Sequence, residues 1–221
     1  MNRVNFDLLP AVRTRPRAHV EPVRSPESST LEVLLGQSSA LHRHLCPRQV
    51  LGVRMALLAG SWLGLNLPRA DKRLLVLVET DGCFADGISV ASGCWLGRRT
   101  LRLEDHGKVA ATFVDTVTGS AVRIAPTLDA RTTARAAHPN LGKWEAYLQG
   151  YKTLEDEILF RVEHVRLRDS LEAITSTRKA RACCAMCGEE ILNAREVIRD
   201  GVTRCRACAG DRYVQPLELG R

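Results

Sequence analysis

The sequence is poor in aromatic residues, which make up 5% of its 221 positions. A surface that stacks nucleobases needs more aromatic side chains, so a stacking platform for single-stranded nucleic acid is not expected. The chain also lacks any apolar run of about 18 residues, which excludes a membrane-spanning helix. Its first residues, MNRVNFDLLPAVRTRPR, lack the apolar stretch of a secretory signal. We therefore expect a cytoplasmic protein with no membrane partner.

Concentrated positive charge is missing as well. The chain holds 32 Lys and Arg against 25 Asp and Glu, a net charge of +7, and this surplus is spread along the sequence. Nucleic-acid binding needs a concentrated basic surface, so we do not expect nucleic acid as a partner. The eight cysteines, in contrast, are clustered, and five of them follow residue 182. In a chain of this size without a secretory signal, such clusters indicate metal binding or redox chemistry.

Changes in composition predict the division of the chain. We expect an α+β core with a mixed or antiparallel sheet and packed helices, because helical and strand patterns do not alternate regularly. A small zinc-ribbon or treble-clef module follows it. The predicted parts are a disordered tail at 1–30, the core domain at 31–170, a linker at 171–182, the four-cysteine module at 183–213 and a tail at 214–221.

Local patterns predict the elements of the core. A short helix is expected to end near Gly36 and to continue as extended chain, and a helix is expected from Pro47 to about Leu65, although two glycines weaken it. A buried central strand at 73–80 precedes a short helix at 84–92 that ends at Gly93. The remaining predictions are three strands within 100–126 with a turn at 116–120, helices within 130–158, and a last strand at 158–167.

The strongest motif is a pair of CxxC sequences near the C-terminus. Each pair places two thiolates within reach of one ion, and the two pairs together can close a tetrahedral shell around zinc. Four thiolates leave no open coordination position, so this zinc would be structural, and Cys183 is a spare thiol. The predicted ligands are Cys184, Cys187, Cys205 and Cys208.

A second cluster lies in LHRHLCP, residues 41–47. In an extended segment side chains alternate, so His42, His44 and Cys46 would face the same way as half of a metal site. Cys46 precedes a proline at a helix start, where the helix dipole would favour its thiolate and lower the thiol pKa. The alternative is that a histidine such as His42 is a simple exposed loop residue.

Partners for this half-site follow the strand at 73–80. Cys83 lies just past the strand, where open sheets tend to place their sites, and Cys94 is a possible further ligand. Either thiol could complete a site for zinc or another transition metal with an open position. A redox pair, Cys46–Cys83 or Cys83–Cys94, is the competing chemistry. Possible acid–base groups nearby are Glu79, Asp81, Asp86 and Lys108.

The succession HxHLCP, VETDGCxxDxI, GCxxG and DxGKxAxTFV resembles the FmdE family, named after the E subunit of formylmethanofuran dehydrogenase, over about residues 31–170. The resemblance implies an α+β core, commonly paired into a homodimer, with a metal site near HxHxCP. The tail resembles the zinc ribbon or treble clef of many members. Arg48 departs from the family, which usually has glycine there, and could bind an anion. The implied ligands are His42, His44, Cys46 and Cys83, with Asp86, Cys94 and Lys108 as nearby motif positions.

Three functions are compatible with these motifs. The first is a metal-binding accessory protein that supports a molybdenum or tungsten oxidoreductase or its assembly. The second is an enzyme that acts on a small molecule through an open-site metal or a thiolate, with candidates Cys46, Cys83, Asp86 and Lys108. The third is a zinc-ribbon regulator that binds nucleic acid. The absence of a complete catalytic set favours the first function and leaves enzymatic activity open.

Overall fold

The computed structural model describes residues 28–175 and 180–215. Residues 1–27 and 216–221 of the predicted tails and residues 176–179 of the predicted linker lie outside the described residues. The chain divides into two compact units, residues 1–166 and 167–221, and each is described by itself. Within the described ranges, no helix is long and apolar enough to cross a bilayer.

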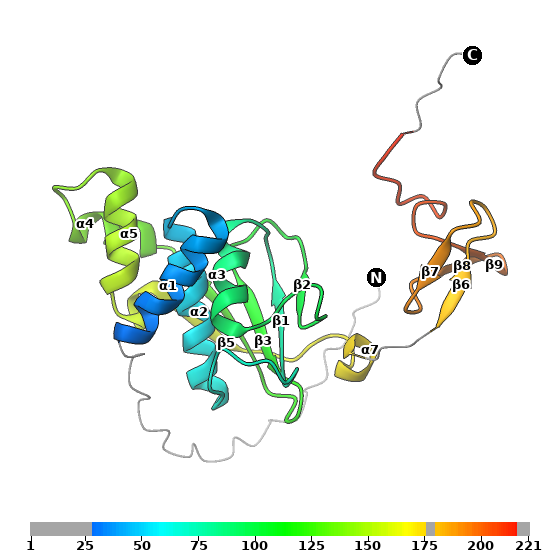
Figure 1. The fold of residues 1–221 in the computed structure, drawn as a ribbon, viewed down its shortest axis with the longest axis horizontal. Coiled ribbons are helices and arrows are strands. Elements are labelled where there is room, and N and C mark those ends of the chain that lie inside the picture. The colour runs from blue at the N-terminus through cyan, green and yellow to red at the C-terminus, as the bar shows by residue number, and fades with distance from the viewer. Residues whose placement is uncertain (1–27, 176–179, 216–221) are drawn as a thin grey trace, which may run out of the picture. The chain divides into compact units, whose positions relative to one another are not determined.

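A mixed sheet of five strands forms the framework of the first unit. Its strands are β1 (Leu74–Val78), β2 (Leu101–Leu103), β3 (Ala111–Asp115), β4 (Ala121–Pro126) and β5 (Phe160–His164). Figure 1 shows β2, β1 and β3 side by side, and the full order is β2-β1-β3-β4-β5. The pairing of β1 with β2 is parallel and all other pairings are antiparallel. The predicted α+β class with a mixed sheet is confirmed.

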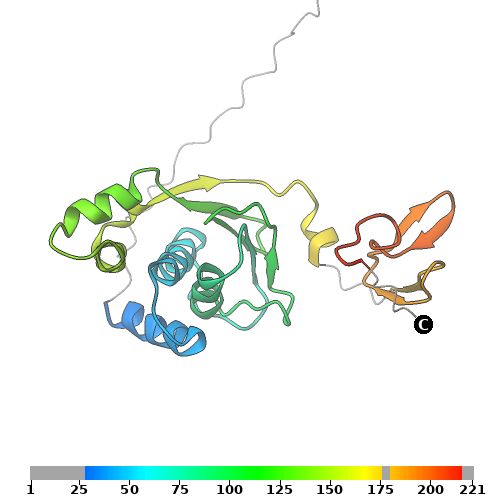
Figure 2. The same cartoon turned by 90° about the horizontal axis from the view of Figure 1, so that it is seen from above.

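Helices cover one face of this sheet (Figure 2). They are α1 (Ser28–His42), α2 (Pro47–Leu63), α3 (Cys83–Ser92), α4 (Ala130–Ala137), α5 (Lys143–Thr153) and α6 (Asp156–Leu159). Alternate strand residues point toward the helices because successive side chains of a strand face opposite sides. The core therefore joins Val76, Val78, Phe113, Val122 and Ile124 of the sheet to buried side chains of α1, α2 and α3.

Glycine and proline set the ends of the two helices nearest the candidate site. Pro47 is the first residue of α2, where its missing N–H costs no hydrogen bond. Gly64 ends α2 with φ 65° and Gly93 ends α3 with φ 73°. Side chains other than glycine are strained in this left-handed conformation. The boundaries of both helices agree closely with the predictions.

The prediction that the first helix ends near Gly36 is wrong, because α1 continues to His42. Glycine inside a helix costs only about 1 kcal/mol relative to alanine. Leu34, Leu35 and Ser38 are almost completely buried on both sides of this position. Their packing against the core outweighs the local preference of glycine.

The second unit consists of small elements. They are α7 (Leu171–Thr175), β6 (Arg181–Cys183), β7 (Glu190–Leu192), β8 (Val197–Arg199) and β9 (Val202–Arg204). The strands form two antiparallel hairpins, β6–β7 and β8–β9. The short helix α7 lies where a polar linker was predicted, and the Ser170 hydroxyl accepts the backbone N–H of Ala173 near its start.

Asp115 at the end of β3 makes a buried ion pair with Arg73, at 2.9 and 2.8 Å. It also accepts hydrogen bonds from Val117 N–H and from the Thr118 hydroxyl. The Arg73 guanidinium holds the pKa of Asp115 well below its usual range. The carboxylate therefore stabilises the folded state above the pKa of an unfolded Asp, about 3.9, and this contribution is lost as the pH falls further.

We expect Asp115→Asn to lower the free energy of unfolding by about 1–2 kcal/mol at neutral pH. Urea titrations of both proteins at several pH values would measure the difference. It should be constant from pH 5 to 8 and shrink below about pH 4, because the wild-type carboxylate then takes up a proton. A difference that grew on acidification would contradict this assignment.

Candidate functional site

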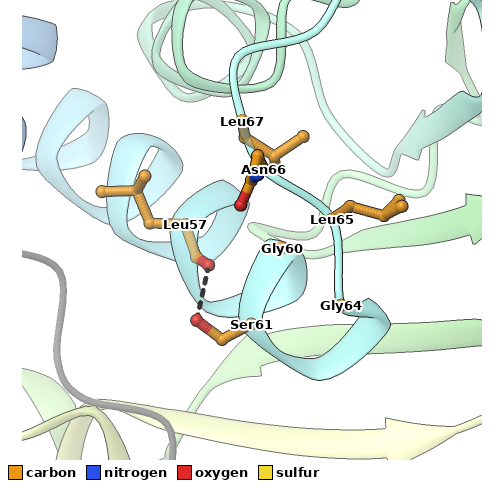
Figure 3. Close-up of a pocket in the computed structure, with 7 residues that line it drawn as sticks. All are labelled: Leu57, Gly60, Ser61, Gly64, Leu65, Asn66 and Leu67. Carbon is orange, nitrogen blue, oxygen red and sulfur yellow. Dashed lines mark hydrogen bonds between the residues drawn. The ribbon is translucent and has the colours of Figure 1, made fainter.

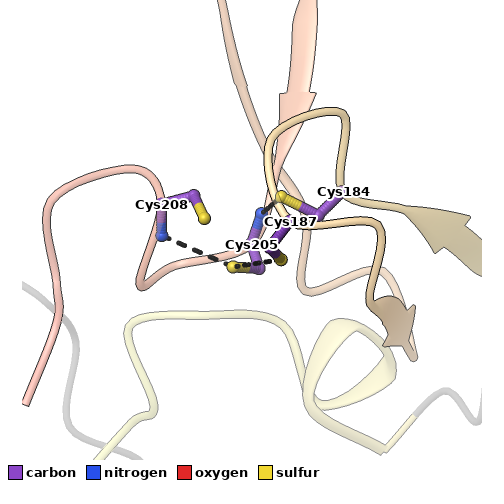
Figure 4. Close-up of side chains that lie close together, drawn as sticks. All are labelled: Cys184, Cys187, Cys205 and Cys208. Atoms are coloured by element: carbon purple, nitrogen blue, oxygen red, sulfur yellow. Dashed lines mark hydrogen bonds between the residues drawn. The ribbon is translucent and has the colours of Figure 1, made fainter. Parts of the chain in front are cut away.

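The clearest site lies in the second unit, where four cysteines converge (Figure 4). The sulfur atoms of Cys184, Cys187, Cys205 and Cys208 all lie within 4.8 Å of one another. The Sγ atoms of Cys187 and Cys205 are 3.9 Å apart. This is the donor set and spacing of a structural zinc site, so these residues fit a zinc ion.

Two tight turns present these sulfurs. Cys184 and Cys187 belong to the turn between β6 and β7, where Gly188 has φ 75°. Cys205 and Cys208 follow β9, and the Cys205 and Cys208 N–H groups donate to the sulfurs of Cys184 and Cys205. Such N–H donors stabilise thiolate charge. The spare thiol, Cys183, is exposed on β6 and is not part of the four-sulfur group.

The thiols of this cluster differ in acidity. The backbone N–H groups of Cys205 and Cys187 lower the pKa of Cys184 to about 6. The N–H of Glu189 acts to lower the pKa of Cys187, but the neighbouring thiols, above all Cys184, raise it to about 12. Zinc binding must therefore displace protons from this cluster, which makes the affinity weaker in acid.

The candidate core site lies where α2 and α3 begin. Cys46 is the N-cap residue of α2, and Cys83 is the first residue of α3, which follows β1. The thiol of Cys46 lies within hydrogen-bonding reach of the Cys83 thiol. The structure thus brings together these two cysteines of the predicted core site.

The histidines reach the same helix starts by a route that differs from the prediction. His42 is the last residue of α1, so the proposed extended alternation of residues 42, 44 and 46 is wrong. Arg43 has φ 66°, and this left-handed residue turns the chain so that the His42 and His44 rings lie 4.8 Å apart. His42 Nδ1 is 2.8 Å from Oδ2 of Asp86, one turn beyond Cys83 on α3.

The predicted acidity of Cys46 is also wrong. Burial raises the pKa of its thiol, and the nearby Cys83 raises it further, although the Gln49 N–H acts in the opposite direction. The side chain is only 7% exposed. Loss of water therefore outweighs the helix N-terminus, and Cys46 is a poor thiolate nucleophile at neutral pH.

The core residues do not form a closed ligand shell. Across residues 28–175 and 180–215, only the C-terminal cysteines place three or more donor atoms of His, Cys, Asp or Glu within 4.8 Å. The core cluster consists instead of two contacts, His42–Asp86 and Cys46–Cys83. Both involve the first turn of α3.

Other predicted residues lie elsewhere. Cys94 is buried beyond the far end of α3, where its thiol donates to the Leu74 carbonyl oxygen. The ten residues of α3 span about 15 Å, so Cys94 is not brought to Cys83. The Glu79 carboxylate binds Arg123, which lowers its pKa. Asp81 is exposed, and the exposed Lys108 acts on Glu79.

The sequence analysis missed the buried support of Cys46. Gln49 Oε1 accepts the Cys46 N–H at 2.7 Å, and Gln49 Nε2 donates to the carbonyl and hydroxyl oxygens of Ser38 on α1. Glutamine three residues after an N-cap is the second half of a capping box. The Cys-x-x-Gln spacing was therefore the signal that could have predicted this link between α1 and α2.

A cavity of about 380 Å³ lies at the other end of α2 (Figure 3). Leucine and glycine residues between positions 57 and 67 form most of its wall, together with Ser61 and Asn66. None of these side chains is titratable. The cavity therefore contains none of the predicted site residues and offers no acid–base group.

Family models match two parts of the chain. Residues 41–180 match the model described as "FmdE, Molybdenum formylmethanofuran dehydrogenase operon". Residues 177–214 match the prokaryotic dksA/traR C4-type zinc finger. The second match includes all four cysteines of the C-terminal cluster.

Known proteins with similar sequence or structure were also found. A probable S-adenosyl-L-methionine-binding protein of Archaeoglobus fulgidus is 30% identical over 213 residues, or 86% of this chain. The chain spans 56% of the length of that relative. The crystal structure of an FmdE-like protein of tungsten formylmethanofuran dehydrogenase, from Syntrophus aciditrophicus, has a TM-score of 0.56 and 19% identity. That match covers 84% of this chain and 95% of the other and shows a shared fold.

Proposed function

The chain belongs to the FmdE family, and from this premise we propose that it is a metal-binding accessory protein of a molybdenum or tungsten oxidoreductase. Its core would bind zinc or another transition metal through His42, His44, Cys46 and Cys83. Its C-terminal zinc finger would hold a separate, structural ion. The core metal would supply an open coordination position, and the chain would support the oxidoreductase as a subunit or during assembly.

The observation that carries this proposal is the contact between His42 and Asp86, 2.8 Å long. A carboxylate on one ring nitrogen fixes the tautomer and orientation of an imidazole, and metal-binding histidines commonly have such a partner. The Asp86 contact occupies Nδ1, so Nε2 is the nitrogen that remains to bind a metal. Asp86 is therefore assigned a positioning role and not that of an acid or base.

The same contacts favour an accessory role over thiolate catalysis. Cys46 is buried and its pKa is raised. The carboxylate of Glu79 is engaged by Arg123. A nucleophile with an adjacent base is the usual signature of covalent catalysis, and neither group provides it. Two soft sulfur donors next to imidazoles suit zinc or a similar transition metal instead.

S-adenosylmethionine is a second ligand to consider, since the Archaeoglobus relative has that name. Nucleoside sites commonly use a carboxylate to bind the ribose hydroxyls, as dinucleotide-binding sites do. The cavity at the end of α2 has no carboxylate among its lining residues. We therefore do not extend this ligand to the present chain.

Metal counting by elemental analysis tests the proposal. We expect two metal ions per chain in the purified full-length protein, and one per chain in Cys83→Ser, because a core ligand is lost. Asp86→Asn should retain the ligands but weaken core-metal affinity about 10- to 100-fold. Competition with a chelator of known affinity would measure that change.

His106→Ala is the matched control, because His106 is an exposed histidine outside the cluster. It should bind two ions with wild-type affinity. A single ion in the wild-type protein would refute the core site. For the accessory role, deletion of the gene should lower the activity of a molybdenum or tungsten oxidoreductase in the native host, and unchanged activity would argue for another role.

We also propose that the chain forms a homodimer, as the resemblance to the family implies. Light scattering during gel filtration should give about twice the chain mass of 24.4 kDa. A mass of one chain at micromolar concentration would reject stable pairing.

A further inference from the structure

The sheet ends in a basic surface on the side away from the candidate metal cluster. Because β2 runs parallel to β1 and β3 runs antiparallel, the loops before β1, before β2 and after β3 meet at one end. These loops are residues 69–73, 95–99 and 116–120, and we call them together the basic end. The cluster of Cys83 follows the opposite end of β1, which spans about 16 Å.

Hydrogen bonds hold the loops of the basic end together. Arg98 donates to the carbonyl oxygen of Ala70, which joins the loop before β2 to the loop before β1. Thr116 donates through its N–H to the Arg73 carbonyl oxygen at 2.8 Å, which joins the turn after β3 to the same segment. The surface is therefore a defined structure and not three independent loops.

Positive charge dominates this surface. It carries five cationic side chains against two carboxylates, Asp71 and Asp115, which leaves a surplus of three. The carboxylates already bind Arg69 and Arg73. Lys72 and Arg99 are exposed and have no ion pair with any described residue. Their backbones have φ 64° and 60°, unusual values for residues with side chains.

Apolar side chains are exposed among these cations. Trp95 is 38% exposed and Leu96 65% exposed in the loop before β2. Val117 is 73% exposed in the turn after β3. Apolar groups surrounded by charge are typical of interaction sites, and Trp and Arg are enriched where proteins bind each other.

We propose that the basic end is a docking surface for an acidic protein segment that also carries apolar side chains. Four of its five cations are arginines, and interfaces between proteins favour Arg over Lys because guanidinium binds carboxylates in two-pronged fashion. Anionic membranes attract both residues alike. The proposal does not depend on whether the core binds a metal.

The chain itself offers no evident occupant. Residues 1–27 hold five arginines and three acidic residues, so their net charge has the same sign as the surface. Residues 180–215 are almost neutral, with six arginines and five acidic residues. Charge complementarity therefore points to a separate protein. Its docking would leave the opposite end of β1, with Cys83, uncovered.

Fluorescence anisotropy with the full-length chain and a labelled peptide of alternating glutamate and leucine tests the proposal. The peptide should bind at low salt, and more weakly as salt screens the charges. The Lys72→Glu/Arg99→Glu double variant should weaken binding about tenfold, since two exposed attractions become repulsions. Leu96→Ser should weaken it about threefold.

The Lys143→Glu/Arg166→Glu double variant is the matched control, because it reverses two exposed cations outside the basic end. It should bind the peptide as the wild type does. A glutamate–serine peptide should bind more weakly than the glutamate–leucine peptide. Circular dichroism of each variant would show that the fold is retained.

Several results would overturn the proposal. They are no peptide binding at low salt, or equal losses in the two double variants. Tighter binding of phosphatidylglycerol vesicles or single-stranded DNA, lost in Lys72→Glu/Arg99→Glu, would assign the surface to a membrane or to nucleic acid. A change of oligomeric state in that variant would assign it to a second copy of the chain.

Discussion

Replacement of Cys205 by serine is expected to abolish zinc binding by the C-terminal module and to unfold residues 180–215. Of these residues only Cys184 and Ile191 are buried, so apolar burial cannot stabilise the module alone. A structural zinc ion supplies about 10–16 kcal/mol of apparent binding free energy, which in such a module is folding free energy. Loss of one ligand removes the ion and, with it, the folded state.

Elemental analysis and backbone amide NMR spectra would measure this outcome. In Cys205→Ser, one metal ion per chain should be lost and the amide signals of residues 180–215 should collapse to unfolded positions. Signals of residues 28–166 should not move, because the first unit has its own core. Cys183→Ser is the control: this exposed thiol lies outside the four-sulfur group, so the variant should keep its zinc. A folded module in metal-free Cys205→Ser would show that zinc is not needed.

The zinc site could be predicted because its chemistry is local. Each Cys-x-x-Cys pair lies in one tight turn, so its spacing alone places two sulfurs together. The ends of α2 and α3 could be predicted for a similar reason: Pro47, Gly64 and Gly93 each have a conformational preference that neighbouring residues do not override. Local rules were sufficient where one short segment determines the geometry.

The core site could be predicted only in part, because distant packing determines it. The residues were identified, but the route was wrong: α1 continues through Gly36, and Arg43 instead of a strand turns His44 beside His42. The acidity of Cys46 was also misjudged, since its 7% exposure is a result of tertiary packing. Neither the contact between His42 and Asp86 nor the distance of Cys94 follows from spacing along the chain.

Glycine at positions 52 and 87 is the second feature with a large expected effect. A Cβ atom on Gly52 would lie 2.3 Å from the carbonyl oxygen of Phe84, and one on Gly87 would lie 2.4 Å from that of Gln49. Backbone atoms cannot rotate away as a side chain can. Glycine within α2 was expected to weaken that helix, but these two glycines allow α2 and α3 to cross in close contact.

We therefore expect Gly52→Ala to lower the free energy of unfolding by about 3 kcal/mol, the upper end for overpacked cores. The Tm should fall by roughly 6–12 °C. Helix propensity alone predicts the opposite sign, since alanine stabilises a helix by about 1 kcal/mol relative to glycine. Thermal and urea unfolding of the first unit would measure which effect is larger.

Gly36→Ala in α1 separates these two effects. No atom lies within 4 Å of a Cβ at this position, so propensity acts alone and the variant should gain about 0.5–1 kcal/mol. If Gly52→Ala were also stabilised, the close crossing of α2 and α3 would not be required for the fold.

The same crossing fixes the candidate metal site, because α2 follows Cys46 directly and α3 begins at Cys83. A helix pair forced apart at Gly52 would separate the two thiols, which lie near the crossing at the helix starts. Gly52→Ala should thus lose the core metal at a temperature where the protein is still folded, whereas Gly36→Ala should keep it. Retention of that metal by a folded Gly52→Ala protein would mean that the ligands adapt independently of the helices, and the site would then depend on the loop of residues 43–46 rather than on the helix pair.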